Sequence, residues 1–349
     1  MSDFHSLKVS RIDRLTPESV AVSLEIPTAL RDTFDFKAGQ YITVRSEKTG
    51  RENHRAYSIS SIPGLPELTI GIKQVKGGKF SEFANETLKA GDVLEVMPPQ
   101  GRFIYEKGGT GKNLIAFAAG SGITPVMSIL QTALESDPEG KAVLVYGNRS
   151  REETMFLEKI RELQEKYADR FVLHDIYSRS RYDETLFGRI EKSTVNFITK
   201  NKHRDLQFDR YYICGPEPMI RAVEETLLEN GAAREQVFHE LFTTSGEEDP
   251  LSQELEGMTR LKVVLDDETH ELTMDRKGVV LDAVLAAKID APYSCQGGIC
   301  STCIARIREG NAKMAKNQIL TDSEIEEGLI LTCQAHPTSG ELTVDYDDV

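Results

Sequence analysis

Four cysteines in the last third of the chain constrain its fold more than any other feature. Cys295, Cys300 and Cys303 are separated by four and then two residues, and Cys333 follows after 29 more. Four thiolates at this spacing can hold a [2Fe–2S] cluster, in which each of the two irons takes two protein ligands. The glycine pair in the first gap lets the loop wrap a cluster and turn backbone N–H groups toward its sulfurs. We therefore expect an iron–sulfur centre. Zinc and inert thiols are the alternatives, although structural zinc usually uses paired short spacings.

The remaining cysteine and the start of the sequence favour a cytoplasmic protein. Cys214 makes the cysteine count odd, which argues against a framework of disulfide bonds. The first residues lack the basic start and apolar run of a secretory signal. The sequence also has no stretch of about 18 uncharged apolar residues, so we expect no membrane span.

Acidic residues are concentrated in the same third of the chain as the four cysteines. The formal net charge of the 349 residues is −14, and residues 259–349 alone hold nine Lys and Arg against sixteen Asp and Glu. An acidic chain is a poor partner for nucleic acid, so we expect none. We expect the acidic segment to dock on a basic surface of a partner protein, with a solvated acidic face as the alternative.

Hydrophobic patterning divides the chain into three domains and a linker. Residues 1–106 alternate with period two between Gly and Pro turns, which predicts an antiparallel β-barrel. Residues 107–242 alternate apolar strands with helical stretches, which predicts an α/β domain with a doubly wound parallel sheet. Residues 243–258 are polar and acidic, as in a flexible linker. Residues 259–349 start with a hairpin pattern and a short helix, which predicts a separate α+β domain.

Some elements within these domains can be placed more closely. One short helix is expected in the barrel, near residues 81–88. In the α/β domain, helical stretches are expected over 151–167 and 186–199, and a last edge strand over 237–242.

Two short motifs in the barrel domain carry groups suited to a flavin nucleotide. Arg55-Ala56-Tyr57-Ser58 lies in a strand-like stretch, and Gly78-Lys79-Phe80-Ser81 opens the one short helix. A guanidinium can bind a pyrophosphate through two hydrogen bonds, a tyrosine ring can lie flat on a flavin, and a serine hydroxyl can meet a ring atom. The helix N-terminus adds free N–H groups for phosphate. The alternative for the first motif is an ordinary strand with an exposed arginine.

The α/β domain has two glycine-containing motifs at the ends of buried strands. Gly120-Ser121-Gly122-Ile123-Thr124-Pro125 follows the first such strand and starts a helix, where the pyrophosphate of a dinucleotide should lie. It departs from the G-x-G-x-x-G fingerprint because its sixth residue is Pro, which suits a first helical turn. Cys214-Gly215 ends the last buried strand, at the sheet edge where ligands bind. Cys214 has the alternative role of a small buried residue.

In this order and spacing, the motifs resemble those of the ferredoxin–NADP⁺ reductase superfamily. Residues 259–349 resemble plant-type ferredoxins, which implies a β-grasp-like fold for this domain. Within the superfamily, the chain is similar to the reductase components of multicomponent oxygenases, that of phenylacetyl-CoA epoxidase foremost. The resemblance implies FAD, with FMN as the alternative, and catalytic roles for Ser58, Thr124 and Cys214, the last two near the nicotinamide.

The same resemblance assigns the ligands of the cofactors. It pairs Cys295 with Cys300 on one iron of the cluster, and Cys303 with Cys333 on the other. The residues that it implies for flavin and coenzyme binding are Arg55, Ala56, Tyr57, Ser58, Gly78, Lys79, Phe80, Ser81, Gly120, Gly122, Thr124, Pro125, Arg149, Ser178, Arg179, Cys214, Gly215 and Phe242.

These modules predict an oxidoreductase that passes electrons from a nicotinamide, through a flavin and an iron–sulfur cluster, to a protein acceptor. A hydride carries two electrons, the cluster takes one at a time, and a flavin can handle both. The resemblance implies an oxygenase as acceptor, foremost phenylacetyl-CoA epoxidase and hence phenylacetate catabolism. The alternatives are another client, such as a Rieske-type or other monooxygenase or a hybrid-cluster protein, and a redox sensor without steady turnover.

The coenzyme is expected to be NADPH in preference to NADH. Ser178-Arg179 follows the strand expected over 171–177, where relatives in the resembled family that use NADPH often place a Ser-Arg pair on the 2′-phosphate. A guanidinium and a hydroxyl suit a dianionic phosphate, and Arg149 or Arg181 would add positive charge. The alternative is that these arginines form a solvated face, which leaves NADH open.

Overall fold

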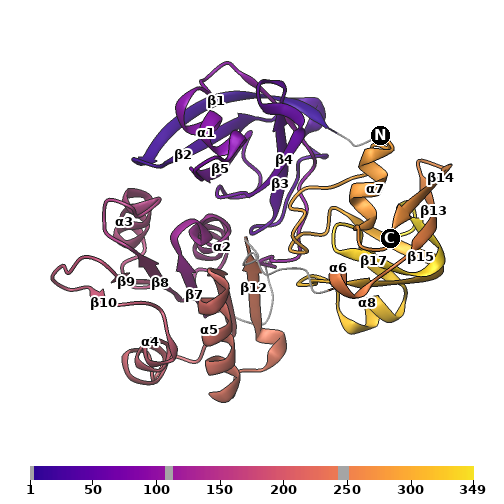
Figure 1. The fold of residues 1–349 in the computed structure, drawn as a ribbon. Helices are drawn as coiled ribbons and strands as arrows, with labels where there is room; N and C mark the ends of the chain where they lie inside the picture. Colours follow the sequence, from indigo (N-terminus) through magenta and orange to yellow (C-terminus); the bar gives the residue numbers. More distant parts are fainter. Residues whose placement is uncertain (1–3, 107–112, 243–250) are drawn as a thin grey trace. The chain divides into compact units, whose positions relative to one another are not determined.

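The computed structural model describes residues 4–106, 113–242 and 251–349, and these form two compact units (Figure 1). One unit lies within residues 5–242 and contains an antiparallel and a parallel sheet. The other contains residues 251–349 and a mixed sheet. No helix within the described ranges is long and apolar enough to cross a membrane.

The N-terminal sheet is a six-stranded antiparallel barrel, as the sequence predicts. Its strands follow the order β4-β3-β6-β1-β2-β5, and a bridge between Ile59 and Ile70 joins the two ends of that order. Alternate side chains such as Leu7, Val22 and Ile42 are fully buried inside it. The elements are β1 (His5–Thr16), β2 (Ser19–Glu25), η1 (Thr28–Leu30), β3 (Tyr41–Ser46), η2 (Glu47–Thr49), β4 (Gly50–Ser58), β5 (Glu67–Lys73), α1 (Lys79–Glu86) and β6 (Val93–Val96).

The second sheet has six parallel strands in the order β10-β9-β8-β7-β11-β12, which confirms the doubly wound domain. The chain runs outward from β7 to β10 and then returns to the other side of β7, so the strand order reverses between β7 and β11. A ligand site is expected outside the carboxyl ends of the strands at such a reversal. The strands are β7 (Leu114–Ala119), β8 (Ala142–Asn148), β9 (Phe171–Tyr177), β10 (Leu186–Phe187), β11 (Arg210–Gly215) and β12 (Val237–Leu241).

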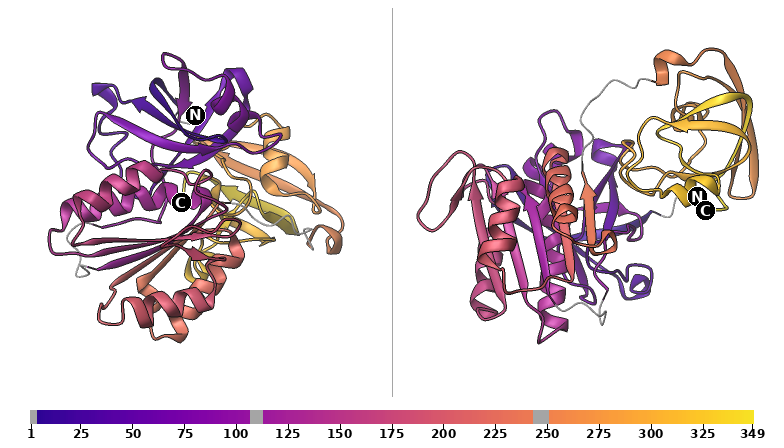
Figure 2. Two further views of the ribbon diagram at one scale, coloured as in Figure 1. Left: turned by 90° about the vertical axis from the view of Figure 1, so that its left-hand side faces the viewer. Right: turned by 90° about the horizontal axis from the view of Figure 1, so that it is seen from below.

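Helices cover both faces of this parallel sheet. In Figure 1 and Figure 2, α2 and α3 lie on one face, while α4 and α5 lie on the other. The side of α2 that meets the barrel is hydrogen-bonded to it, since Ser128 Oγ donates to the Ser61 carbonyl at 2.6 Å and Gln131 to the Ser60 carbonyl at 3.0 Å. The helical elements are η3 (Gly120–Gly122), α2 (Ile123–Ser136), α3 (Leu157–Lys166), α4 (Lys192–Asn196), the π-helix η4 (Phe197–Lys202), α5 (Glu217–Glu229) and η5 (Arg234–Gln236).

Two of the expected helical stretches are wrong in part. The helix expected over 151–167 starts only at Leu157, because Phe156 adopts a left-handed backbone conformation. The stretch 186–199 starts as the strand β10, and Gly188, with a φ of 127°, separates that strand from α4.

The C-terminal unit is an α+β domain, as expected. Its sheet has the order β14-β13-β17-β15-β16, in which β13 and β17 are parallel and the other pairs antiparallel. Residues 243–250 of the expected linker lie outside the described residues, and the short helix α6 (Leu251–Glu254) follows them. The other elements are β13 (Met258–Leu265), β14 (Glu268–Asp275), α7 (Val280–Ala286), β15 (Ile304–Met314), α8 (Asp322–Glu326), β16 (Leu329–Leu331) and β17 (Ala335–Asp345).

Candidate functional site

The barrel and the parallel sheet meet at a serine, a glutamate and a cysteine. Ser58, the last residue of β4, donates a hydrogen bond from Oγ to Oε2 of Glu240 on β12, at 3.2 Å. Glu240 is the register partner of Cys214 on the neighbouring strand β11. Two of the three predicted catalytic residues, Ser58 and Cys214, are thus linked through a residue that sequence reasoning missed. The one available signal was an acidic side chain inside the strand expected over 237–242.

Both Glu240 and Cys214 have shifted acidities. Removal of water around the Glu240 carboxyl raises its pKa to about 8, although the hydrogen bond from Ser58 acts in the opposite direction. Complete burial, with a further contribution from the Glu240 carboxylate, raises the pKa of the Cys214 thiol well above its usual value. The thiol is therefore neutral at physiological pH, and Glu240 carries a proton on a large fraction of the molecules.

The glycine loop after β7 approaches the end of β11 closely. A Cβ atom on Gly122 would lie 2.1 Å from the Cys214 carbonyl oxygen, so only glycine fits there. The loop is the short helix η3, and α2 follows it directly. Thr124, the third predicted catalytic residue, is buried in the first turn of α2, where its Oγ1 donates to the Ser121 carbonyl at 3.0 Å. The structure thus places the glycine loop at Gly120–Gly122 against the Cys214-Gly215 end of β11.

The two flavin motifs also come together. Tyr57 on β4 lies against Phe80 on α1, with 5.7 Å between the ring centroids. At the start of α1, Ser81 Oγ accepts a hydrogen bond from the Val75 N–H at 3.0 Å and donates to the Gly78 carbonyl at 3.0 Å. A Cβ atom on Gly78 would lie 2.6 Å from Ser81 Oγ, so glycine keeps this turn tight.

This donor set fits a flavin nucleotide. An aromatic ring stands beside a helix N-terminus, and the guanidinium of Arg55 lies on an exposed side chain two residues before that ring. Arg55 donates to the backbone carbonyl of His54 at 2.6 Å. Phe242 is also among the predicted cofactor-binding residues, and it packs against the apolar core of the parallel-sheet domain. Its role toward a cofactor stays a prediction.

The predicted 2′-phosphate residues lie side by side at another part of the sheet edge. The Ser178 N–H donates to the Asn148 carbonyl at 3.0 Å, and the Arg179 N–H donates to the Arg149 carbonyl at 2.9 Å. These two hydrogen bonds lie just beyond the end of the β8–β9 pairing and bring the backbones of Arg149 and Arg179 together. In the sheet order, β8 and β7 separate β9 from β11, a span of about 14 Å at the usual strand spacing. A dinucleotide would lie across this edge.

The four cysteines of the C-terminal unit converge. Cys300, Cys303 and Cys333 are buried, and Cys295 is partly buried. Hydrogen bonds with the Cys300 and Cys333 thiols and with backbone N–H groups of the loop hold the pKa of Cys295 well below its usual value. Cys303 is in turn in contact with Cys333. The sulfurs therefore lie within reach of one another in pairs, as the ligands of a dinuclear cluster must.

The cysteine loop also contains backbone and hydroxyl groups that suit a cluster. The Gly297 N–H donates to Cys295 Sγ at 3.3 Å. Gly298 has a φ of 72°, and a Cβ atom there would lie 2.9 Å from the Lys316 carbonyl oxygen. The hydroxyl of Ser294 is buried and has no hydrogen-bond partner in the described part of the chain. An orphaned donor beside the first cysteine fits a site that holds a sulfur-rich anion.

Three family models match the chain in the order that the motifs predict. They are the oxidoreductase FAD-binding domain over residues 6–105, the oxidoreductase NAD-binding domain over 116–225 and the 2Fe-2S iron–sulfur cluster binding domain over 263–338. These matches confirm the expected modules, the fold class and the cofactor types. The individual site residues and the domain boundaries stay predictions.

Curated relatives match over nearly the whole chain. One of the subunits of 1,2-phenylacetyl-CoA epoxidase from Escherichia coli is 33% identical over 353 residues, which cover 99% of each chain. The ferredoxin reductase component of 3-ketosteroid-9-alpha-monooxygenase from Rhodococcus rhodochrous is 34% identical and covers 97% of this chain and 96% of its own. Among solved structures, phthalate dioxygenase reductase matches with a TM-score of 0.62 and 20% identity over 98% of both chains, which shows a shared fold.

Proposed function

Since this chain belongs to the ferredoxin–NADP⁺ reductase type of oxidoreductases, with FAD-binding, NAD-binding and 2Fe-2S domains, we propose that it carries electrons from NADPH to an oxygenase component. The observation that carries the proposal is the contact of Ser58 with Glu240 beside Cys214. It joins the end of the flavin motif to the sheet edge where the nicotinamide is expected. The two cofactors would therefore meet at these three residues.

Bound FAD would supply the ability to accept two electrons as a hydride and release them one at a time. The chain's own residues would bind the two cofactors, orient them and exclude water. The Ser58 hydroxyl donates its one proton to Glu240, and it would turn toward a flavin ring atom if the flavin binds there. The Glu240 carboxyl can hold a proton near neutral pH, because its pKa is about 8. The buried Cys214 thiol is neutral and adds no charge beside Glu240.

The acceptor that we propose is phenylacetyl-CoA epoxidase. The relative named for that enzyme and this chain cover each other almost completely, and the reductase of a ketosteroid monooxygenase is about as similar. A ketosteroid monooxygenase is therefore the second candidate.

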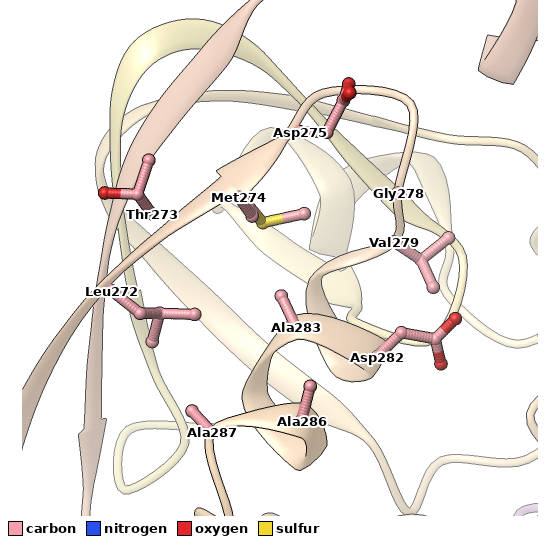
Figure 3. A pocket seen from close by; sticks show the side chains of 10 residues that line it. All are labelled: Leu272, Thr273, Met274, Asp275, Gly278, Val279, Asp282, Ala283, Ala286 and Ala287. Carbon is pink, nitrogen blue, oxygen red and sulfur yellow. The ribbon is translucent and has the colours of Figure 1, made fainter.

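We propose that the acceptor docks on the acidic C-terminal unit. Besides its net acidic composition, this unit has a shallow groove between β14 and α7 (Figure 3). Apolar side chains such as Leu272, Met274 and Ala283 line the groove, and the carboxylates of Asp275 and Asp282 stand at its rim. A basic partner surface with an apolar contact would suit this arrangement. Electron transfer to the acceptor should then weaken as ionic strength rises.

The proposal is tested by reconstitution. The purified protein is expected to contain one FAD, two irons and two acid-labile sulfides per chain, measured by released flavin and by iron and sulfide assays. With NADPH and the oxygenase component of phenylacetyl-CoA epoxidase, it should support epoxidation of phenylacetyl-CoA. If it supports only ketosteroid hydroxylation by the corresponding monooxygenase, the second candidate is correct. Zinc without sulfide would contradict the cluster, and FMN would contradict the assignment of FAD.

A further inference from the structure

Phe156 has a backbone conformation that a bulky side chain rarely adopts. Its φ is 58° and its ψ is 20°, in the left-handed region, and it directly precedes α3. In the described ranges it is the one aromatic residue with a positive φ. Such a conformation costs free energy and persists only where the surrounding structure enforces it. A strained residue beside the sheet edge where the dinucleotide is expected is a candidate for a functional role.

The Phe156 ring reaches the barrel at a glycine. Gly71 lies inside β5, and a Cβ atom there would be 3.0 Å from Phe156 Cε2 and 2.7 Å from Thr124 Cγ2. Glycine weakens the interior of a strand and marks a place where another group must approach closely. Gly71, Thr124 and Phe156 therefore form a three-way contact between the barrel, the start of α2 and the loop after β8.

A buried tyrosine links the loop before α2 to the segment before α3 within the parallel-sheet domain. The hydroxyl of Tyr146 on β8 lies 2.9 Å from the Gly120 carbonyl oxygen and 3.4 Å from that of Met155. Gly120 starts the dinucleotide loop, and Met155 precedes Phe156. The fully buried Tyr146 hydroxyl thus links the loop to the residue before Phe156.

We propose that Phe156 is a positioning residue for hydride transfer. Its ring would hold β5 of the flavin domain at a fixed separation from Thr124, and so fix the nicotinamide loop relative to the flavin. The proposal rests on the proposed function, in which a hydride with its two electrons moves from the nicotinamide ring to the flavin. Hydride transfer needs reacting atoms about 3–3.5 Å apart, and a misplacement of about 1 Å can lower the rate about 100-fold.

The alternative is that Phe156 only contributes to the core, since it is half-buried and packs against the apolar cluster of the parallel-sheet domain. The two roles differ in what a variant changes. A core residue affects the melting temperature and cofactor content, whereas a positioning residue affects the limiting rate of flavin reduction at saturating coenzyme. Coenzyme binding should not change for a positioning residue, because Phe156 holds the loop rather than the coenzyme.

The test compares Phe156→Leu and Phe156→Gly with wild type, and with Phe197→Leu as a matched control on η4 of the same domain. Stopped-flow absorbance gives the limiting rate of flavin reduction by NADPH. Calorimetry gives the dissociation constant of NADP⁺ for the oxidised protein, and released flavin and a thermal melt report integrity. We expect both Phe156 variants to reduce flavin at least about tenfold more slowly, with full FAD content and NADP⁺ affinity unchanged. The Phe197 variant should match wild type.

Several results would overturn the positioning role. These are an unchanged limiting rate, a higher KM with the same limiting rate, or a slower rate only in step with lost FAD. Gly71→Ala provides a second approach if the Phe156 variants do not fold, because its added methyl group pushes on Thr124 and the Phe156 ring from the barrel side. It should also slow flavin reduction without releasing FAD, and a wild-type rate would contradict the proposal. A wild-type flavin that neither NADPH nor NADH reduces would contradict the proposed function as well.

Discussion

Ser58 and Glu240 are 182 residues apart in the sequence, yet the Ser58 hydroxyl donates to the Glu240 carboxylate at 3.2 Å. The contact joins the last residue of a flavin-domain strand to the final strand of the parallel sheet. It also places a carboxyl with a raised pKa beside the buried thiol of Cys214.

Glu240→Gln should remove a pH dependence from flavin reduction. Below pH 8 the Glu240 carboxyl is mostly protonated, and above it the carboxylate can stabilise the positive charge left on the nicotinamide. The limiting rate in wild type should therefore rise as pH increases through about 8. The variant should be slower by about tenfold or more above that pH, as expected for loss of a charged hydrogen bond. Stopped-flow measurements from pH 6.5 to 9.5 check this, with Glu235→Gln as control, and an identical profile in E240Q would count against the role of Glu240.

The His174–His203 pair should make stability depend on pH. The two Nε2 atoms lie 2.8 Å apart, and burial, together with the neighbouring His203 and Lys202, lowers the pKa of His174 to about 4. The unfolded chain, with a histidine pKa of about 6.5, binds more protons between these values. The pair's contribution to stability is therefore complete above about pH 6.5 and is lost as pH falls toward 4.

The free energy of unfolding should fall by about 1–2 kcal/mol as the pH is lowered. This is less than the pKa difference alone would give, because the pair is partly exposed to water. Urea unfolding at pH 7.5 and pH 5.0, followed through flavin release, measures it. His174→Gln should show a smaller difference between the two pH values than wild type, while His270→Gln in the C-terminal unit should not. An unchanged difference in the His174 variant would show that the pair is not responsible.

Arg179→Ala should change the coenzyme preference. If Arg179 binds the 2′-phosphate beside Arg149, the variant loses a charged hydrogen bond, and kcat/KM for NADPH should fall about tenfold or more. NADH should be used almost as before. Arg204→Ala is the control, because that arginine is exposed, pairs with Asp205 at 3.5 Å and lies outside the predicted coenzyme site. Equal losses with both coenzymes, or a wild type that prefers NADH, would reject the assignment.

Cys303→Ser should remove the cluster and leave the flavin in place. Cys303 is buried in the C-terminal unit, whereas the flavin motifs lie in the other compact unit. The variant should lose the iron and sulfide and lower cytochrome c reduction by about tenfold or more, as expected when one of four cluster ligands is removed. Ferricyanide reduction by NADPH should persist, since the flavin can deliver electrons directly. Loss of flavin and ferricyanide activity together with the cluster would contradict independent modules.

The sequence predicted the three modules and their fold class because these rest on local signals. The cysteine spacing, the glycine loop at Gly120–Gly122 and the alternating barrel strands each follow from neighbouring residues. Glu240 could not be found this way, because its importance comes from its register with Cys214 and its contact with Ser58 across two domains.

The start of α3 shows the same limit. Helix propensity in residues 151–156 is ordinary, yet α3 starts only at Leu157, after Phe156 in a left-handed conformation. The Phe156 ring lies against Gly71 of the barrel, a neighbour that local sequence does not reveal. Likewise, the reason for glycine at position 122 is visible only in the folded structure, where the Cys214 carbonyl lies beside it.

The order in which the two redox centres are reduced tests the proposed electron path most directly. The protein is mixed without oxygen with one equivalent of NADPH, and stopped-flow absorbance of the flavin is combined with rapid-freeze electron paramagnetic resonance of the cluster. We predict that flavin absorbance falls first and that the signal of the reduced [2Fe–2S] cluster then appears, with Cys303→Ser showing only the first phase. A cluster that is reduced before the flavin, or that stays oxidised after the flavin is reduced, would contradict a path from NADPH through FAD to the cluster.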